Sequence, residues 1–422
     1  MPSEASDLHT DRLYRRKLLA IATALGGSSI FATSTVGKSL TPPTTTASSP
    51  TILGKTAFIG NLEGQLQAID ITTGDTKWVF ETSDSIISSP TIADNSVVVG
   101  GADGTLYAID VETGEKQWTF ETNGMVRSSP TVVDDTIFVG SNDPNLYAVD
   151  AKTGDQKWAV ETGDNGRSSP TAVNDTVFIG SNDNSLYAVN AETGRKEWVF
   201  QTGDSIGSSP TVANGRVFIG SADTNLYAVD VETGKKEWAV ETEGHVMSSP
   251  TAAEGTVFVG GGSIVYAIDT ETGDQRWIFD SGEVHEQKDD QPAHFGSGVI
   301  GDSSPTVASE TVFVGNSNGT IFAIDAKTGR EQQRFETEIN RLGSSPTVVN
   351  GTVFIGLYQD EFFSVESNVD GSSSGSRVKL GTLGHHNNRS ITVPGFDAGT
   401  ALSGLTGASY LLHRYASSDN AE

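Results

Sequence analysis

The sequence predicts an all-β fold of repeated units, because three features recur together along most of its 422 residues. The tetrapeptide Ser-Ser-Pro-Thr returns about every 40 residues. A turn of the form Ala-x-Asp-x-x-Thr-Gly follows most copies, and a tryptophan stands four residues after its glycine. Short segments rich in β-branched and aromatic residues, which favour strands, fill the intervals between these markers.

The spacing of the tetrapeptide predicts eight units. Its prolines are Pro50, Pro90, Pro130, Pro170, Pro210, Pro250, Pro305 and Pro346. The interval is 40 residues five times, then 55 and then 41. One such unit cannot bury both faces of its sheet, whereas units closed into a ring bury them against each other. We therefore expect an eight-bladed β-propeller.

Each blade is predicted to hold four antiparallel strands. In the fourth copy we expect strands over 169–173, 176–180, 185–189 and 196–200. The Asn-Gly pairs at 214–215 and 350–351 are typical of two-residue hairpins. The eighth copy is degenerate, and its fourth strand is expected at 377–380. The alternative is seven blades plus partial strands.

The repeated tryptophans and turns are interpreted as architecture. All six tryptophans occupy the last motif position: Trp78, Trp118, Trp158, Trp198, Trp238 and Trp277. Docked between blades, each such side chain buries roughly 150–250 Å². In the turn, the Asp carboxylate or Thr hydroxyl is expected to cap backbone amides while Gly takes a positive φ.

The motif resembles the pyrroloquinoline-quinone (PQQ) type repeat, whose tryptophan-docking signature is Ala-x-Asp/Asn-x-x-Thr-Gly-x-x-x-Trp. The likeness covers about residues 48–366 and recurs seven times, with Asn190 replacing the acid once and Gln333 the tryptophan once. It implies an eight-bladed propeller, as in quinoprotein dehydrogenases and in the propeller lipoprotein of the outer-membrane barrel-assembly machinery. It also raises PQQ, held beside Ca²⁺, as a cofactor.

The residues themselves argue against quinoprotein catalysis. There is no cysteine, whereas many such dehydrogenases carry adjacent cysteines, and nearly every acidic residue stands at a repeated turn position. A catalytic site needs one base and one oriented substrate, which breaks the symmetry of a repeat. The Asn/Asp-rich turns also lack the ligand spacing of a calcium loop and are interpreted as turn formers. We expect no catalytic residues, no metal site and no cofactor.

The first residues are interpreted as an export signal. Arg15 and Arg16 precede a short apolar stretch, which resembles a twin-arginine (Tat) signal over 1–33. A Thr/Pro/Ser spacer is expected over 34–47, the propeller over 48–383, and an unassigned tail over 384–422. The protein is thus expected to be extracellular or attached to the cell surface, with membrane contact only through a retained signal segment.

The net charge limits the classes of partner that the protein can be expected to bind. Acidic residues number 54 against 27 basic ones, a formal charge of −27. A nucleic-acid-binding protein carries a basic face, so that class is excluded. The even spread of acids resembles proteins of extreme halophiles and suggests a salt-loving archaeal source.

Departures from the repeat mark the candidate binding residues. The largest is the insertion 281–302, with His285, His294 and Phe295. Arg127 and Arg167 hold matching positions in adjacent blades, directly before Ser-Ser-Pro, where they are expected to lie side by side and bind an anion or pair with neighbouring acids.

The sequence thus favours a non-catalytic exported propeller, expected as a monomer, that serves as a scaffold for protein or peptide partners at one loop face. A PQQ-dependent oxidoreductase is the first alternative. A small-ligand sensor or sugar-binding module is the second.

Overall fold

The structure is a computed structural model that describes residues 38–39, 48–281, 300, 303–337, 342, 344–356, 362–367, 369 and 371–373. The chain divides into two compact units, Met1–His386 and Asn387–Glu422, and all described residues belong to the first. Within these residues 32 strands form and no α-helix does. Accordingly, the described part contains no helix suited to crossing a membrane.

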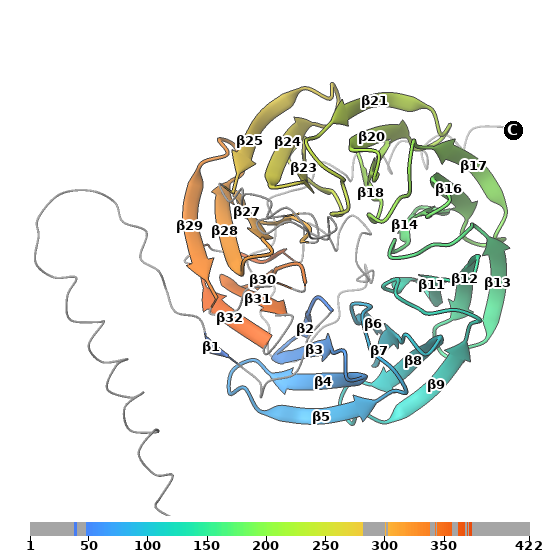
Figure 1. Cartoon of the computed structure of the whole chain (residues 1–422). Helices are drawn as coiled ribbons and strands as arrows, with labels where there is room; N and C mark the ends of the chain where they lie inside the picture. The colour runs from blue at the N-terminus through green and yellow to red at the C-terminus, as the bar shows by residue number, and fades with distance from the viewer. Residues whose placement is uncertain are drawn as a thin grey trace, which may run out of the picture. The chain divides into compact units, whose positions relative to one another are not determined.

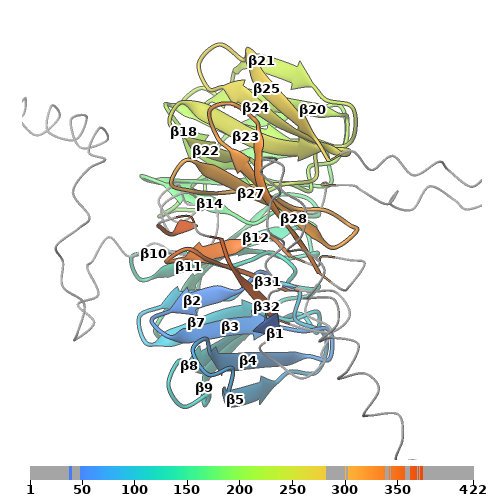
Figure 2. The same ribbon diagram turned by 90° about the vertical axis from the view of Figure 1, so that its left-hand side faces the viewer.

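The strands form eight four-stranded antiparallel sheets arranged around a ring (Figure 1), which confirms the eight-bladed propeller. In Figure 1 the first strand of each blade lies near the centre and the fourth forms the outer rim. We call these strands A to D. Figure 2 shows the same ring from the side, with turns at its two faces.

The first four blades follow the predicted repeat. Blade 1 comprises β2 (Thr51–Leu53), β3 (Thr56–Gly60), β4 (Gln65–Asp70) and β5 (Thr76–Glu81). Blade 2 comprises β6 (Thr91–Ala93), β7 (Ser96–Gly100), β8 (Thr105–Asp110) and β9 (Lys116–Glu121). Blade 3 comprises β10 (Thr131–Val133), β11 (Thr136–Gly140), β12 (Asn145–Asp150) and β13 (Gln156–Glu161). Blade 4 comprises β14 (Thr171–Val173), β15 (Thr176–Gly180), β16 (Ser185–Asn190) and β17 (Lys196–Gln201).

The next four blades complete the ring. Blade 5 comprises β18 (Thr211–Ala213), β19 (Arg216–Gly220), β20 (Asn225–Asp230) and β21 (Lys236–Glu241). Blade 6 comprises β22 (Thr251–Ala253), β23 (Thr256–Gly261), β24 (Ile264–Asp269) and β25 (Gln275–Asp280). Blade 7 comprises β26 (Thr306–Ala308), β27 (Thr311–Gly315), β28 (Thr320–Asp325) and β29 (Glu331–Glu336). Blade 8 comprises β30 (Thr347–Val349), β31 (Thr352–Gly356), β32 (Phe362–Glu366) and β1 (Lys38–Ser39).

The hydrophobic core lies between neighbouring blades. One cluster joins Leu106 and Ala108 of blade 2 to Ile137 and Val139 of blade 3, and all four are fully buried. Strand B is buried almost throughout, while strand D alternates between exposed and half-buried residues. Each sheet therefore buries its two faces against its neighbours, as the ring argument predicts.

Strand A is shorter than predicted because the serines of the Ser-Ser-Pro-Thr motif form hydrogen bonds outside the sheet ladder. β14 begins at Thr171 and not at 169. In every blade the first serine of the motif accepts a hydrogen bond, at 2.7–3.1 Å, from the amide of a glycine in strand B, which is the last residue of the strand except in blade 6, where it is the last but one. That bond ties the entry of the blade to its own second strand.

The second serine and the threonine join each blade to the next. Ser129 N donates to Ser169 Oγ at 2.9 Å, and Thr171 Oγ1 donates to the Pro210 carbonyl at 2.6 Å. Both bonds recur at all eight junctions, with the serine pair at 2.9–3.1 Å and the threonine–proline pair at 2.5–3.0 Å. The motif is therefore a continuous ring of hydrogen bonds at the inner ends of the blades.

The ring closes between blade 8 and blade 1. Ser345 N donates to Ser49 Oγ at 3.1 Å, like every other junction. In addition, β1 pairs with β32 and supplies the fourth strand of blade 8. Residues 38–39 thus take the place for which 377–380 were expected, and 377–380 lie outside the described residues. A strand from before the first blade completes the last one, which holds the two ends of the ring together.

The tryptophans lie at the outer junctions between blades. Trp158 Nε1 donates to the Ala191 carbonyl of the next blade at 3.0 Å, and its ring packs on Gly194. Five of the six tryptophans make the same bond, at 2.9–3.2 Å. At all six, a Cβ placed on the facing glycine would come within 2.7–2.9 Å of indole Cδ2, so only glycine fits there.

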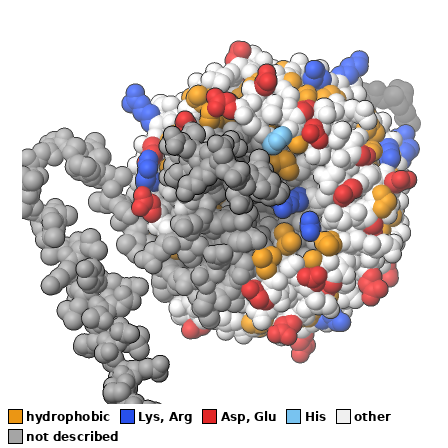
Figure 3. Space-filling view, in the orientation of Figure 1, with side chains coloured by type: hydrophobic (Ala, Val, Ile, Leu, Met, Phe, Trp, Pro, Cys, Tyr) orange, Lys and Arg blue, Asp and Glu red, His pale blue; other side chains and the backbone are white. Residues whose placement is uncertain are grey.

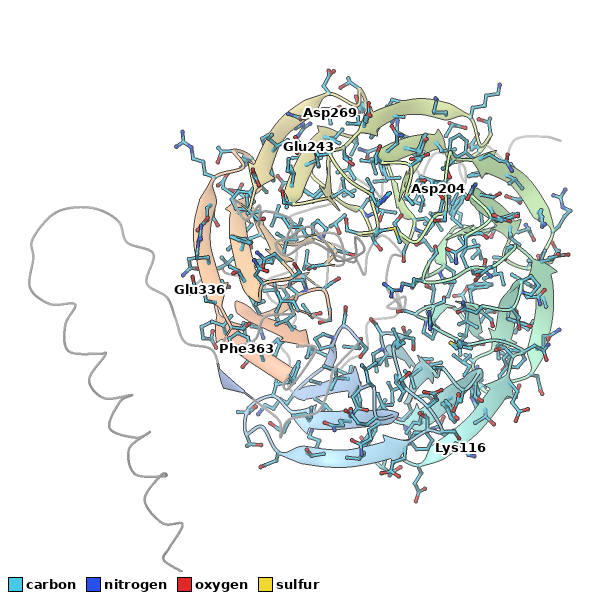
Figure 4. All side chains as sticks on the ribbon, viewed as in Figure 1. Lys116, Asp204, Glu243, Asp269, Glu336 and Phe363 are labelled. Atoms are coloured by element: carbon cyan, nitrogen blue, oxygen red, sulfur yellow. The ribbon has the colours of Figure 1, made fainter. Side chains whose placement is uncertain are left out.

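The turns between strands C and D have the predicted chemistry. Asp110 Oδ1 accepts the amides of Glu112 at 3.0 Å and Thr113 at 2.9 Å, and Gly114 has φ +74°. The bond from Thr113 is the chief reason that the pKa of Asp110 lies below its usual value. Asp269 does the same in blade 6 and also pairs with Arg276 at 2.6 Å. Figure 4 shows Lys116 and Asp269 at the outer edge of the ring.

Candidate functional site: an asymmetric corner of the loop face

Backbone hydrogen bonds define two faces of the propeller. On one face the A–B and C–D turns of a blade are joined, as by Ala151 N to Asp135 O at 3.0 Å. On the other, the B–C turn of one blade is joined to the loop that leaves the preceding blade, as by Asn142 N to Met125 O at 2.9 Å. We call the second face the loop face. Its turns come from two blades at each junction, so it is where departures from the repeat meet.

The acidic residues of the B–C turns are occupied by the fold. Asp143 Oδ2 accepts the Tyr147 hydroxyl at 2.8 Å and the Asn123 amide of the preceding loop at 2.8 Å. Burial, reinforced by this carboxylate, raises the pKa of Tyr147 to about 12. The same Tyr–Asp bond joins Tyr107 to Asp103, Tyr187 to Asp183 and Tyr227 to Asp223, at 2.6–2.7 Å. These carboxylates hold turns and neighbouring blades in place.

The loop that leaves blade 3, residues 162–168, departs from the repeat. Elsewhere an apolar side chain such as Val126 packs on the glycine that ends strand B. Here Asn165 takes that place, fully buried against Gly140. Its Nδ2 donates to the Asn145 carbonyl and its Oδ1 accepts the Thr162 hydroxyl, both at 2.8 Å. Among the described loops, this is the one in which a polar side chain replaces the apolar side chain that packs on the strand-B glycine.

Two asparagines hold this loop from either side. Asn142 Nδ2 donates to Asp164 Oδ1 at 3.4 Å, and Asn182 Nδ2 donates to Asp164 Oδ2 at 3.2 Å. The Asn182 amide also donates to the Asp164 carbonyl at 2.7 Å. Blades 2 and 5 carry alanine at the corresponding position, as Ala102 and Ala222. The arrangement therefore belongs to blades 3 and 4 and not to the repeat.

One predicted arginine, Arg167, lies in this loop, and the other, Arg127, holds the matching position in the loop that leaves blade 2. Arg127 is half-buried and Arg167 is exposed. They stand two residues before Ser129 and Ser169, which are hydrogen-bonded to each other at 2.9 Å. At the matching positions two junctions further on, a Cβ placed on Gly207 would overlap Met247 Cε, so side chains here reach from blade to blade. Figure 3 shows basic side chains near the centre of this view and acidic ones spread around it.

Two buried polar atoms near these arginines have no hydrogen-bond partner. They are Arg127 Nε and Asn142 Oδ1, two of only four such side-chain atoms in the described residues. Asn142 is joined to Met125 by its backbone amide, Arg127 stands two residues after Met125 in the chain, and Met125 is 41% exposed. We call Met125, Arg127, Asn142, Asp164 and Arg167 the arginine corner. It offers one cationic donor and one acceptor with unused hydrogen-bonding capacity.

The other predicted site residues lie outside the described residues. These are His285, His294 and Phe295 of the insertion, and Arg15 and Arg16 of the export signal. Sequence reasoning named Arg127 and Arg167 as candidates and did not name Asn142 and Asp164. The available signal was Ser-Asn-Asp at 141–143 and 181–183, because blades 1, 2, 5 and 7 have Leu62, Ala102, Ala222 and Ser317 in the middle position.

A quinone held beside Ca²⁺ would need hard oxygen ligands around the metal ion. Within the described ranges, no three carboxylate or imidazole groups are placed to hold a metal ion. In blades 2 to 6 the positions directly before the paired serines carry Ile87, Arg127, Arg167, Gly207 and Met247, none of which is a hard oxygen ligand. Asp302 holds this position before Ser303 and lies outside the described residues.

The chain matches the family model described as beta-alanine-activating enzyme, beta-propeller, over residues 42–367. The chain belongs to this β-propeller family. The match spans all eight blades apart from β1. No curated protein matches the chain.

Solved structures share the fold of this family member. BamB from Moraxella catarrhalis is 21% identical with a TM-score of 0.64, covering 78% of this chain and 97% of its own. The computationally designed Ika8 protein is 16% identical with a TM-score of 0.62, covering 79% and 98%. A europium-containing methanol dehydrogenase is 13% identical with a TM-score of 0.60, covering 78% and 85%. At these identities the likeness establishes the propeller and leaves function to the site.

Proposed function

We propose that the protein is a non-catalytic, exported propeller that acts as a scaffold for protein or peptide partners at its loop face. One observation carries the proposal. The repeated Ser, Thr, Asp and Tyr groups are paired within the fold, while two of the four unpaired buried side-chain atoms in the described residues, Arg127 Nε and Asn142 Oδ1, belong to the arginine corner. Arginine and asparagine recognise polar partners, and they supply neither a nucleophile nor a base for catalysis.

Compartment and cofactor follow from the same proposal. The twin arginine at 15–16 supports export by the Tat route, which carries folded proteins and suits a chain of charge −27 that folds in high salt. The scaffold works without a cofactor, since the described side chains provide no set of ligands for Ca²⁺ beside PQQ.

Site-specific crosslinking tests the scaffold. A photoreactive amino acid at Met125, on the loop face, is expected to form an adduct of defined mass with an envelope protein in cells of the source organism. The matched control is Glu112, exposed on the C–D turn of the opposite face, which should give none. Equal labelling at both positions, or none at Met125, would overturn the assignment of the loop face.

A calorimetric titration tests the absence of catalysis. The folded protein in molar salt with Ca²⁺ should release no heat on addition of PQQ. Stoichiometric binding at micromolar or tighter affinity, followed by dye-linked oxidation of an alcohol or sugar, would replace the scaffold with a quinoprotein oxidoreductase.

A further inference from the structure

Three Asn-x-Thr triplets occur in the described residues, at 174–176 in blade 4, 318–320 in blade 7 and 350–352 in blade 8. In a secreted protein this triplet, with any residue but proline in the middle, marks an asparagine that can accept an N-linked sugar at the surface. An Asn-Arg-Ser triplet at 388–390 lies outside the described residues. The triplets read alike in the sequence, so exposure in the fold decides which asparagine a modifying enzyme can reach.

Asn174 stands at the tip of the A–B hairpin of blade 4. The last pair of the β14–β15 ladder is Val173 with Thr176, so Asn174 and Asp175 form a two-residue loop, and both are exposed. The Asn174 side chain forms no hydrogen bond with any of the described residues. Its amide nitrogen is therefore reachable from solvent without breaking a contact of the fold.

The backbone of this turn does not require asparagine. Asn174 has φ +53°, a conformation that asparagine and aspartate tolerate better than most residues with a side chain. Aspartate occupies the same exposed position in blades 2 and 3, as Asp94 and Asp134, both at φ +50°. What asparagine adds in blade 4 is a neutral amide nitrogen in place of a carboxylate oxygen.

The threonine of the triplet is also close to solvent. Thr176 is half-buried, and its hydroxyl donates to Glu197 Oε2 at 3.0 Å. Glu197 is exposed, so water competes for this bond and its net strength is small. The hydroxyl can therefore exchange this partner for an enzyme that reads the triplet.

The other two triplets are held more closely by their surroundings. In blade 7, Asn318 is half-buried and Thr320 is only 7% exposed. In blade 8, the amides of Asn350 and Gly351 donate to the segment 371–372 at 2.9 and 3.0 Å, and Gly351 is buried. Among the triplets in the described residues, the one at 174–176 is thus the most accessible in the folded protein.

We propose that Asn174 carries an N-linked sugar chain, added to the folded protein at the outer side of the membrane. The donor is a sugar chain attached through phosphate to a lipid, and the catalyst is a membrane-bound transferase. A bond forms between Asn174 Nδ2 and the anomeric carbon of the sugar, and the bond from that carbon to the phosphate oxygen breaks. The lipid phosphate leaves with the bonding electrons, and Nδ2 loses one proton.

This inference rests on the proposed export by the Tat route. A protein that is folded before export offers a transferase its exposed asparagines only. The modified turn lies on the face opposite the loop face, because the Asp175 carbonyl accepts the Ala191 amide at 2.8 Å and so joins the A–B and C–D turns. A bulky, hydrated sugar there covers that face and leaves the loop face open to partners.

Glycopeptide mapping tests the site. The full-length protein, expressed in the source organism, is recovered from the secreted and cell-surface fractions and digested. Tandem mass spectrometry with electron-transfer fragmentation, which keeps sugars attached, then locates any modification. We expect a sugar mass on Asn174 and none on Asn318 or Asn350.

Variants test the triplet itself. Asn174→Asp, which copies the turn of blade 3, and Thr176→Val, which removes the hydroxyl, should each abolish the modification at position 174. Thr176→Ser keeps a hydroxyl and should retain it. Only exported protein is compared, so that a loss of folding does not imitate a loss of the sugar.

Blade 3 offers a matched control. Residues 134–136 read Asp-Asp-Thr in a hairpin loop with the same exposure as 174–176. In the Asn174→Asp background, Asp134→Asn completes the triplet there and should move the sugar to position 134. Exported double variant without a sugar at that position would overturn the argument from exposure.

The outcomes separate this inference from the proposed function. Exported protein with unmodified Asn174, or with as much sugar on Asn318 as on Asn174, refutes the modification while export and the scaffold stand. Protein that is confined to the cytoplasm and carries no sugar refutes both export and the modification. A sugar on Asn174 together with failure of the Met125 crosslink keeps the modification and refutes the scaffold.

Discussion

The tryptophan junctions provide a matched pair in which a single hydrogen bond differs. Trp158 and Trp238 each pack on the glycine of the next blade, with indole Cδ2 at 2.9 Å from a Cβ placed there. Their partners Phe138 and Phe218 lie at ring-centroid distances of 5.7 and 5.6 Å. Trp158 Nε1 donates to Ala191 O at 3.0 Å, whereas Trp238 Nε1 is buried without a partner.

The difference arises in blade 6. Its B–C turn is one residue shorter than the others, and Thr270 stands where the other junctions have alanine or valine. The Thr270 hydroxyl donates to the Gly255 carbonyl at 3.2 Å and accepts Asn214 Nδ2 at 3.0 Å. The Thr270 carbonyl, which corresponds to the Ala191 carbonyl, accepts no hydrogen bond from Trp238 Nε1.

Replacement of each tryptophan by phenylalanine should therefore cost different amounts. Trp158→Phe loses ring area and a hydrogen bond worth about 1 kcal/mol net. Trp238→Phe loses similar ring area but removes a buried, unpaired N–H that costs about 1–3 kcal/mol in the parent. We expect Trp158→Phe to be more destabilising by about 2 kcal/mol. Trp158→Ala should cost about 3–5 kcal/mol.

The assay is equilibrium unfolding in urea, in molar KCl, followed by far-UV circular dichroism. The shift in midpoint at a common slope gives the difference in unfolding free energy, provided that the slopes agree. Losses within about 0.5 kcal/mol of each other, well inside the range of ordinary surface substitutions, would refute the hydrogen-bond argument.

Four further outcomes are expected. Thr171→Val, which removes the hydroxyl that reaches the next blade, should lower the unfolding free energy by about 1 kcal/mol with an unchanged circular dichroism spectrum; no loss would deny the inner ring a role in stability. Because the pKa of Tyr147 is raised from 10.0 to about 12, its neutral form stabilises the fold below pH 10, and this contribution disappears as pH rises to about 12. Tyr147→Phe should lose less stability than the parent over that interval, measured as urea midpoints against pH, and parallel curves would contradict this. The thermal midpoint should rise by several degrees from about 0.1 M to about 1 M KCl, because screening weakens repulsion among the acids; a flat response would argue against salt adaptation. Replacing Arg15 and Arg16 by lysine in a fusion of residues 1–47 to a folded reporter should abolish its export, whereas continued export would rule out the Tat assignment.

Most of the fold was predictable because its determinants are local and repeated. Strands 176–180 and the C–D turns were placed correctly from β-branched runs and from Asp-x-x-Thr-Gly. The start of strand A was wrong by two residues, since Ser169 and Pro170 read as strand but serve the inner ring. A local pattern does not show that a serine bonds to a serine 40 residues away.

The candidate site was predictable only in part. Arg127 and Arg167 stood out because they break the repeat at matching positions. Asn142 and Asp164 did not, because Asn and Asp are ordinary in turns and their contact crosses from one blade to the next. Unpaired atoms in particular are invisible in a sequence, since pairing depends on which groups meet in space.

By itself, the sequence predicted eight blades, the strand order within the first seven and the nature of the turns. The repeat period and the turn chemistry act over a few residues and need no distant partner. The tertiary structure decided how the ring is held: the Ser–Ser and Thr–Pro bonds, the β1 strand that completes blade 8, and the missing bond of Trp238. It also decided that Arg127 Nε and Asn142 Oδ1 stay free. These features join residues far apart in the chain, and only closure of the ring brings such residues within hydrogen-bonding distance.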